Sequence, residues 1–88
     1  MKAVDRELRL RRLTVDEALF RLDQYLNDAF MAGLPCVRII HGKGTGTLRR
    51  AVHDVLANHP LVESFRLADY GEGDYGVTIV ELANRSES

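Results

Sequence analysis

Residues 37–50, V-R-I-I-H-G-K-G-T-G-T-L-R-R, contain the change of pattern on which the fold depends. The β-branched run Val37–His41 predicts a central strand. The three alternating glycines that follow allow a tight turn. Apolar residues then recur at helical spacing, at Leu48, Ala51, Val52, Val55 and Leu56. The stretch therefore predicts a strand, a glycine-rich loop and a helix in direct succession.

The sequence on both sides extends this unit to the order β-α-β-α-β-β. A capping box formed by Thr14 and Glu17 predicts the start of the first helix, and Gly33 with Pro35 predicts its end. Crossover helices favour parallel pairing of the first strands, whereas the short link Asp69–Gly76 favours a hairpin at the end. We therefore expect an α/β fold, an α+β two-layer sandwich with a mixed four-stranded sheet and two helices. The predicted strands are Glu7–Arg11, Val37–His41, Val62–Ala68 and Val77–Leu82.

The composition is that of one soluble globular domain, with 88 residues of which 45% are hydrophobic and 28% charged. We expect residues 1–6 to be a lead-in, residues 7–82 the domain and residues 83–88 a frayed tail, which suits a domain cut from a longer protein. No apolar run approaches the roughly 18 residues that cross a bilayer, and no signal peptide precedes the fold, so no membrane partner is expected. The single Cys36, interpreted as a packed residue at a strand entrance, cannot form an internal disulfide, and a cytoplasmic location is expected.

Charge is distributed unevenly along the chain, although the net charge is only −1. The stretch from Arg38 to Arg50 contains basic residues and no acid, residues 2–12 carry a second basic cluster, and acids dominate toward the C-terminus. Parallel strands place their carboxyl ends at one edge of a sheet, where ligands bind. Arg11–Arg12 and His41–Gly46 follow such ends, so we expect the two basic clusters to lie together and to hold a polyanion. A solvated surface of mixed charge is the alternative.

The glycine-rich loop is the expected phosphate site. Its glycines let backbone amides approach an oxyanion, and the start of the following helix adds positive potential. Lys43 supplies a full charge, and a neutral His41 would position a phosphate or act as a base near pH 7. A structural role for His41, hydrogen-bonding the loop backbone, is an equal alternative, and a glycine turn without a ligand is a further one. The other expected phosphate contacts are Gly42, Gly44, Thr45, Gly46, Arg49 and Arg50.

Other motifs give weaker signals. The loop lacks the spacing of a P-loop, and the G-x-G-x-x-G match at residues 71–76 precedes a strand and carries two acids, so we interpret it as a turn. His53 and His59 are interpreted as surface or capping residues. Tyr70 and Tyr75 are expected to pack in the turn rather than to stack on bases. No ligand spacing predicts a permanently bound metal, and a need for Mg²⁺ or Mn²⁺ is left open.

Four stretches resemble the small MutS-related (Smr) domain, in particular the version at the C-terminus of the second bacterial class of MutS-like ATPases. They are E-L-R-L-R-R-L-T-V-D-E-A-L from Glu7, V-R-I-I-H-G-K-G-T-G-T-L-R-R-A-V from Val37, H-P-L-V-E-S-F-R from His59 and G-V-T-I-V-E-L from Gly76. The resemblance covers residues 7–82. It implies a βαβαββ fold like the C-terminal domain of bacterial translation initiation factor 3. It also implies a nicking endonuclease, metal-assisted or metal-independent, that prefers branched DNA, although some relatives act on RNA or ribosomes.

The first of these stretches departs from the family motif. The motif reads L-D-L-R-G or L-D-L-H-G where this chain has Leu8 to Arg12, so Arg9 replaces the acid and Arg12 replaces the glycine. Glu7, two residues away on the same strand face, is a weak substitute for the missing carboxylate. The extra arginines favour phosphate binding and lower the expectation of cleavage.

Two functions follow from the resemblance. In the first, the domain nicks branched DNA and suppresses homologous recombination as part of a MutS-like ATPase. Lys43 and the loop amides would then bind phosphate, with Arg11 as a second clamp and His41 as a proton-transfer group. In the second, the domain is a non-catalytic module that brings the ATPase to branched DNA, or binds RNA or the ribosome. The candidate catalytic residues are Glu7, Arg11, His41 and Lys43, and Arg9 and Arg12 are expected to add to nucleic-acid binding.

Overall fold

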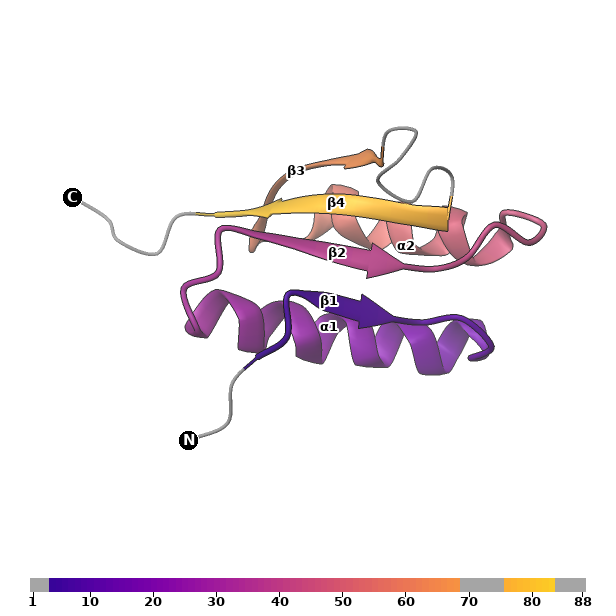
Figure 1. The fold of residues 1–88 in the computed structure, drawn as a ribbon, viewed down its shortest axis with the longest axis horizontal. Coiled ribbons are helices and arrows are strands. Elements are labelled where there is room, and N and C mark those ends of the chain that lie inside the picture. The colour runs from indigo at the N-terminus through magenta and orange to yellow at the C-terminus, as the bar shows by residue number, and fades with distance from the viewer. Residues whose placement is uncertain (1–3, 69–75, 84–88) are drawn as a thin grey trace.

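The protein forms one four-stranded sheet and two helices in a computed structural model that describes residues 4–68 and 76–83. The elements are β1 (Glu7–Arg9), α1 (Val15–Met31), β2 (Cys36–Ile40), α2 (Thr47–Asn58), β3 (Val62–Leu67) and β4 (Val77–Leu82), as Figure 1 shows. The predicted order β-α-β-α-β-β is therefore confirmed. Tyr70, Tyr75 and most of the expected turn lie outside the described residues.

The strands lie in the order β1-β2-β4-β3 (Figure 1). β1 pairs in parallel with β2, and β4 is antiparallel to both β2 and β3, so the sheet is mixed as predicted. Parallel pairing of the first strands holds only for β1 and β2, because β4 lies between β2 and β3. The sequence of β4 explains its central place, since five of its six residues are buried and both faces of the strand are apolar.

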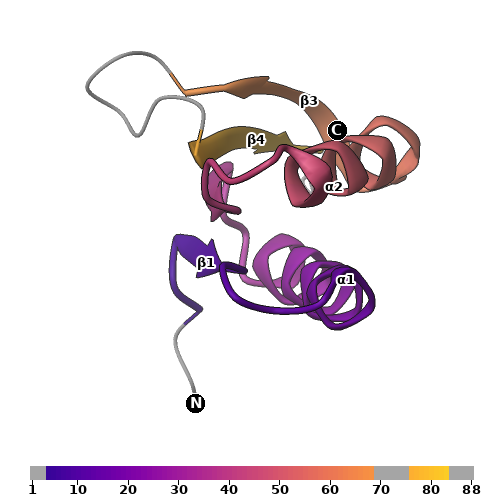
Figure 2. The same cartoon turned by 90° about the vertical axis from the view of Figure 1, so that its right-hand side faces the viewer.

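Both helices cover the same face of the sheet, as Figure 2 shows. Each helix follows a strand of the parallel pair, so the N-termini of α1 and α2 lie at the edge where β1 and β2 end. A smaller apolar cluster, centred on Val77 and Ile79, lies on the other face of the sheet. The core between the two layers includes the fully buried side chains of Leu10, Leu22, Leu26, Ile39, Val52 and Val80.

The ends of α1 follow the signals in the sequence. Thr14 Oγ1 accepts a hydrogen bond from the Glu17 amide at 3.2 Å, and Glu17 Oε1 accepts one from the Thr14 amide at 3.1 Å. After the helix, Gly33 has a φ of +80°, and its amide donates to the carbonyl of Phe30 at 3.0 Å. The capping box and the glycine stop are both confirmed.

Two local predictions about strand ends are wrong. Cys36 is exposed, not packed, because it is the first residue of β2 and belongs to the outer face of the sheet. β1 ends at Arg9 instead of Arg11, because Arg12 adopts a φ of +73° and turns the chain toward α1. Neither helix in the described part of the chain is long and apolar enough to cross a bilayer.

Candidate nucleic-acid interface

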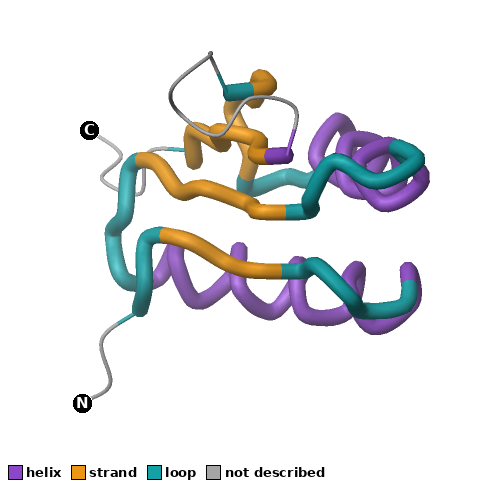
Figure 3. Tube along the Cα trace, turned by 45° about the vertical axis from the view of Figure 1, so that its right-hand side comes forward, coloured by secondary structure: helices purple, strands orange, loops and turns teal. Residues whose placement is uncertain are grey.

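The loop after β2 and the turn after β1 lie at the same edge of the sheet, as the tube in Figure 3 shows. The register pairs Arg9 with Ile40, so the two strands end together. A Cβ atom placed on Gly42 would lie 3.1 Å from both Cγ and Cδ of Arg11, which means that the arginine stem lies directly against the loop. The structure therefore brings together the two basic clusters that the sequence predicts at this edge.

The loop backbone requires glycine at three alternating positions. Gly42, Gly44 and Gly46 have φ values of +83°, +31° and +90°, in the region that L-residues rarely adopt. The amides of His41 and Gly42 both donate to the carbonyl of Gly76, each at 3.0 Å, and so fasten the base of the loop to the start of β4. Because the Gly42 amide is used in this way, a ligand has to be bound by donors farther along the loop.

The start of α2 supplies those donors. Gly46 is the N-cap and, as a glycine, has no side chain with which to cap the helix, and the first turn of α2 contains no acidic residue. The amides of a first helical turn have no acceptor within the helix, and the helix dipole adds positive potential there. The side chains of Arg49 and Arg50 turn back toward this end, since a Cβ on Gly46 would lie 3.0 Å and 3.8 Å from their guanidinium nitrogens.

A cavity of about 350 Å³ opens between this loop and the start of α1. Its described lining includes Lys43 and Arg49 and contains no carboxylate. The Thr45 hydroxyl lies 2.9 Å from that of Thr47 and 3.4 Å from the Thr47 amide, which holds the loop against the helix start. A concave site with cations, amides and no acid is suited to an oxyanion such as a phosphate.

His41 lies beneath the loop, with only 4% of its surface exposed. Its Nδ1 lies 3.0 Å from the carbonyl oxygen of Gly42, and its Nε2 lies 2.8 Å from Oγ1 of Thr78. A carbonyl oxygen only accepts hydrogen bonds, so Nδ1 carries the proton and donates to the loop backbone. This geometry favours the structural alternative for His41, because both ring nitrogens are already hydrogen-bonded within the protein.

The interpretation of His53 as a surface or capping residue is wrong. Its side chain is partly buried, its Nε2 lies 2.7 Å from Oγ1 of Thr78, and its ring packs on Phe65 and His41 at centroid distances of 5.0 Å and 5.9 Å. Burial lowers the pKa of His41 and of His53, and the nearby charge of Arg49 lowers both further. Both rings are therefore neutral near pH 7.

His59, in contrast, does cap a helix. It is the C-cap of α2, its Nδ1 accepts a hydrogen bond from the Leu61 amide at 3.1 Å, and its Nε2 lies 3.0 Å from Oδ1 of Asp23 on α1. These contacts join the C-terminal end of α2 to α1. His59 thus belongs to the scaffold at the end of α2 opposite the loop.

Glu7 lies away from the loop, although it belongs to the same strand as the basic cluster. It pairs in register with Arg38, four residues before Gly42, which corresponds to roughly 13 Å along a strand. Its Oε1 lies 4.0 Å from Nη2 of Arg9, and both side chains are substantially exposed. The acid position of the family motif is therefore filled by an arginine that pairs with the neighbouring carboxylate.

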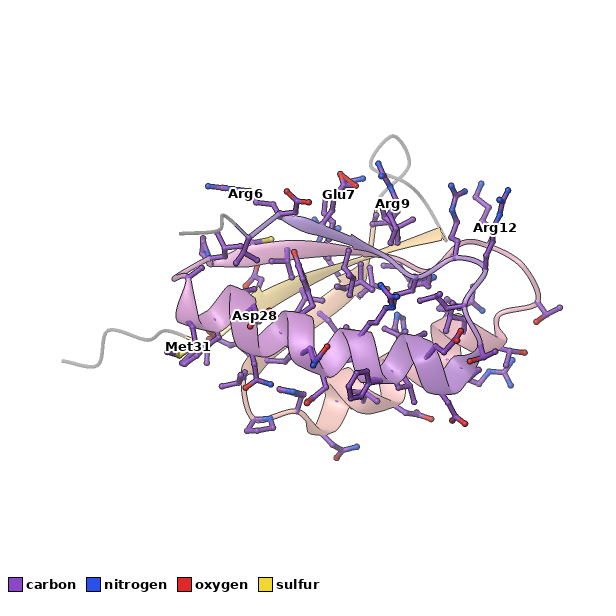
Figure 4. All side chains as sticks on the ribbon, turned by 90° about the horizontal axis from the view of Figure 1, so that it is seen from below. Arg6, Glu7, Arg9, Arg12, Asp28 and Met31 are labelled. Atoms are coloured by element: carbon purple, nitrogen blue, oxygen red, sulfur yellow. The ribbon has the colours of Figure 1, made fainter. Side chains whose placement is uncertain are left out.

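Arg12 explains why the family motif has a glycine at its position. The residue is exposed, and its φ of +73° is the only positive φ of a non-glycine residue in the described part of the chain. Figure 4 shows that Glu7, Arg9 and Arg12 point away from α1, so these arginines face solvent. The chain accepts a strained backbone here and gains a cation next to the loop edge.

Two features of the site were not predicted from the sequence: the presence of Thr78 and the role of His53. A signal for Thr78 was present, since alternation along β4 places it on the inner face with Val80 and Leu82. A buried hydroxyl on an apolar face requires a hydrogen-bond partner. His53 lies on α2 next to the buried Val52 and was the available partner, but only the packing of α2 against β4 reveals the pair.

No metal centre is evident in residues 4–68 and 76–83. No group of three His, Cys, Asp or Glu side chains gathers there in a way that could hold an ion. The donors at the loop are amides, hydroxyls and cations, which bind anions.

The fold and the site define a class of small α/β domain, in which a two-layer βαβαββ unit carries a basic, glycine-rich loop at the start of its second helix. A family model described as the Smr domain matches residues 8–83. The chain therefore belongs to the Smr domain family.

Several relatives share this domain. The chain is 60% identical over 79 residues to Endonuclease MutS2 of Thermomicrobium roseum and 55% identical over 82 residues to Endonuclease MutS2 of Pelotomaculum thermopropionicum. These matches cover 90% and 93% of this chain but only 10% of each relative, so the chain spans about a tenth of their length.

Solved structures agree with the fold. The crystal structure of the Smr domain of Thermus thermophilus MutS2 matches with a TM-score of 0.87 and 49% identity, covering 90% of this chain and 99% of that one. YdaL, a stand-alone small MutS-related protein from Escherichia coli, matches with a TM-score of 0.83 and 29% identity, covering 88% of this chain and 63% of that one. The chain is thus homologous to the Smr domain of MutS2 endonucleases.

Proposed function

We propose that this domain is an endonuclease module that binds DNA phosphates at the loop of residues 41–46 and nicks one strand of branched DNA. The observation that carries the proposal is the cavity between the loop, the start of α2 and the start of α1, whose described lining contains no acid. The stem of Arg11 lies beside it, against Gly42. The names of the relatives, Endonuclease MutS2, support a phosphodiester as the substrate. Within a full-length MutS-like ATPase, such nicking would remove branched recombination intermediates and suppress homologous recombination.

Each basic residue has a distinct role in this proposal. Lys43 and Arg49 bind the phosphate together with the first amides of α2, and they stabilise the negative charge that develops during cleavage. Arg11 clamps the same backbone from the side of β1. His41 holds the loop in shape, since both of its ring nitrogens are hydrogen-bonded within the protein. Arg12 extends the contact along the DNA backbone.

A second candidate function is binding without cleavage, which would deliver the ATPase to branched DNA. It is favoured by Arg9, which occupies the acid position of the family motif and pairs with Glu7 at 4.0 Å. Glu7 also lies roughly 13 Å along the strand from the loop, too far to act on a phosphate held there. Binding to RNA or to the ribosome relies on the same phosphate contacts and belongs to this second class.

A denaturing-gel assay separates the two functions. End-labelled four-way-junction DNA and plain duplex DNA are incubated with the wild-type domain, with and without Mg²⁺ or Mn²⁺. Lys43→Glu is the test variant, and Arg21→Glu on α1 is the matched charge reversal outside the site. We expect cuts in the junction with the wild type and Arg21→Glu, and none with Lys43→Glu.

Arg9→Asp, which restores the acid of the family motif, tests the second candidate function, binding without cleavage. If the wild type shifts the junction on a native gel but leaves it uncut, whereas Arg9→Asp cuts it, the wild-type domain is a binding module. Cuts that are equal for the wild type and Lys43→Glu would refute the assigned site. Stronger competition by a four-way RNA junction of matched sequence would place the natural substrate among RNAs.

A further inference from the structure

A hydrogen-bond chain joins α2 to the base of the loop through a residue of β4. Nε2 of His53 lies 2.7 Å from Oγ1 of Thr78, which lies 2.8 Å from Nε2 of His41. Nδ1 of His41 then lies 3.0 Å from the carbonyl oxygen of Gly42. Thr78 is fully buried and His41 is 4% exposed, whereas His53 is only partly buried. The chain therefore runs from a ring that water can reach to the backbone of the loop.

The chemistry of the partners determines the direction of every hydrogen bond in this chain. The Gly42 carbonyl accepts from Nδ1 of His41, so Nε2 of the neutral His41 ring is an acceptor. The Thr78 hydroxyl has one proton and donates it to that nitrogen. Toward His53 the same oxygen must accept, so Nε2 of His53 carries a proton and donates it. His53, Thr78, His41 and Gly42 thus form a chain in which each donor points toward the loop.

Such a chain accommodates one additional proton without moving a heavy atom. A proton that binds Nδ1 of His53 lets Nε2 of the same ring give its proton to the Thr78 oxygen. The Thr78 hydroxyl passes its own proton to Nε2 of His41. His53 is then neutral again, and His41 carries the positive charge. All three hydrogen bonds remain: the two that join the rings through Thr78 have reversed their direction, and the one from His41 to Gly42 is unchanged.

We propose that Thr78 and His53 are positioning residues that hold His41 and the loop through one shared proton. The affinity of the loop for a phosphate then depends on the protonation of His53 on α2. This inference rests on the proposed function, because it assigns a phosphate to the loop. A proton delivered to His41 places a positive charge under the site. By linkage, a phosphate bound at the loop favours that proton, and binding is accompanied by proton uptake.

The charged and polar groups around the pair act in opposite directions. Burial and the guanidinium of Arg49 oppose a proton on either ring, and each ring opposes a second proton on the other. The carboxylate of Asp54 on α2 favours a proton on His53, and the Gly42 carbonyl favours one on His41. From β3, the ring of Phe65 contributes an apolar contact to His53. Protonation of the pair therefore requires a pH below the ordinary histidine pKa of 6.5, and the pair resists a second proton.

Nitrogen-detected NMR of the imidazole rings tests the chain without any ligand. At pH 7.5 we expect a proton on Nδ1 of His41 and on Nε2 of His53. On acidification both rings should respond with a common midpoint, and the amide signals of the loop should follow it. In Thr78→Val the hydroxyl is lost at nearly constant volume, and the two rings should titrate separately. Thr78→Ser, which retains the hydroxyl, should restore the common midpoint.

Two NMR results would overturn the inference. One is the opposite tautomer on either ring at pH 7.5. The other is a common midpoint that persists in Thr78→Val. Should circular dichroism show that Thr78→Val is unfolded, His53→Gln takes its place. In that variant the loop amides should lose most of their response to pH between 7.5 and 5.5, and an unchanged response would contradict the chain.

Fluorescence anisotropy with labelled four-way-junction DNA tests the control of binding. One added charge beneath the site should tighten wild-type binding about fivefold between pH 7.5 and pH 5.5. His59→Gln, which removes a histidine at the far end of α2, should keep this change. His53→Gln and Thr78→Val should reduce it to less than about twofold, and Thr78→Ser should recover it.

The two measurements distinguish failure of the inference from failure of the proposed function. A wild-type domain that binds no junction DNA at either pH refutes the proposed function, while the NMR result still decides whether the chain exists. A wild-type domain that binds equally well at both pH values refutes the shared-proton control and leaves the proposed function intact. Equal pH responses in His53→Gln and the wild type refute it as well.

Discussion

Replacing Arg12 by glycine should stabilise the protein, even though it removes a cation from the loop edge. Arg12 has a φ of +73° and an exposed side chain, so the substitution relieves backbone strain and sacrifices little packing. The left-handed conformation costs an L-residue about 1–2 kcal/mol relative to glycine. The greater freedom of glycine in the unfolded chain offsets about 0.5–1 kcal/mol of that gain.

The net stabilisation is about 0.5–1 kcal/mol, which raises the Tm of a domain of this size by about 2–8 °C. Thermal unfolding at pH 7, followed by far-ultraviolet circular dichroism, measures the change directly. Arg12→Ala is the matched control, because it removes the same charge and keeps the strained φ. The difference between the two variants therefore isolates the backbone contribution from any relief of repulsion among the arginines.

The reasoning would be refuted if Arg12→Gly were no more stable than Arg12→Ala. That result would mean that the backbone at this position is not strained in solution. Arg12→Gly should at the same time bind junction DNA more weakly than the wild type, since it loses a phosphate contact. A more stable variant with weaker binding is the signature of strain accepted for function.

Three further outcomes are expected. Gly42→Ala and Gly33→Ala both place a side chain at a φ near +80°, and each should lower the free energy of unfolding in urea by about 1 kcal/mol. Only Gly42→Ala should weaken DNA binding, since Gly33 lies at the far end of α1. Burial lowers the pKa of His41 and of His53 below the ordinary value of 6.5. The unfolded chain therefore binds more protons below pH 6.5. The free energy of unfolding, measured with urea, should have its full value above that pH and should fall on acidification. A free energy that rises instead would contradict the burial of the two rings. Lys43→Ala should reduce the slope of log Kd against log salt concentration by about one, in anisotropy titrations from low to moderate salt.

The local elements could be predicted because their signals are local. The capping box of Thr14 and Glu17, the stop at Gly33 and the bounds Val77–Leu82 all appear in the structure as the sequence indicates. Each depends on a backbone preference or on a periodicity that the chain carries within a few residues. The end of β1 was misplaced because the positive φ of Arg12 is a property of the turn and not of arginine.

The loop edge could be predicted as well, because parallel strands joined by a crossover helix end on the same side. That rule places Arg11–Arg12 and the loop at one edge of the sheet, and the structure adds that the stem of Arg11 lies against Gly42. The family resemblance added the expectation of a nuclease, and it also drew attention to the two motif positions at which Arg9 and Arg12 stand.

The sequence alone determined the six elements, the mixed sheet and the basic loop at the start of α2. Only the tertiary structure decided that β4 enters the sheet between β2 and β3 and that His53 of α2 reaches Thr78 of β4. Those two facts bring together His53, Thr78 and His41. Along the chain, Thr78 lies 25 residues from His53 and 37 residues from His41. The strand order minimises exposed apolar surface over the whole sheet, and no local sequence pattern contains that comparison. The hydrogen-bond chain beneath the loop could therefore be found only in the folded structure.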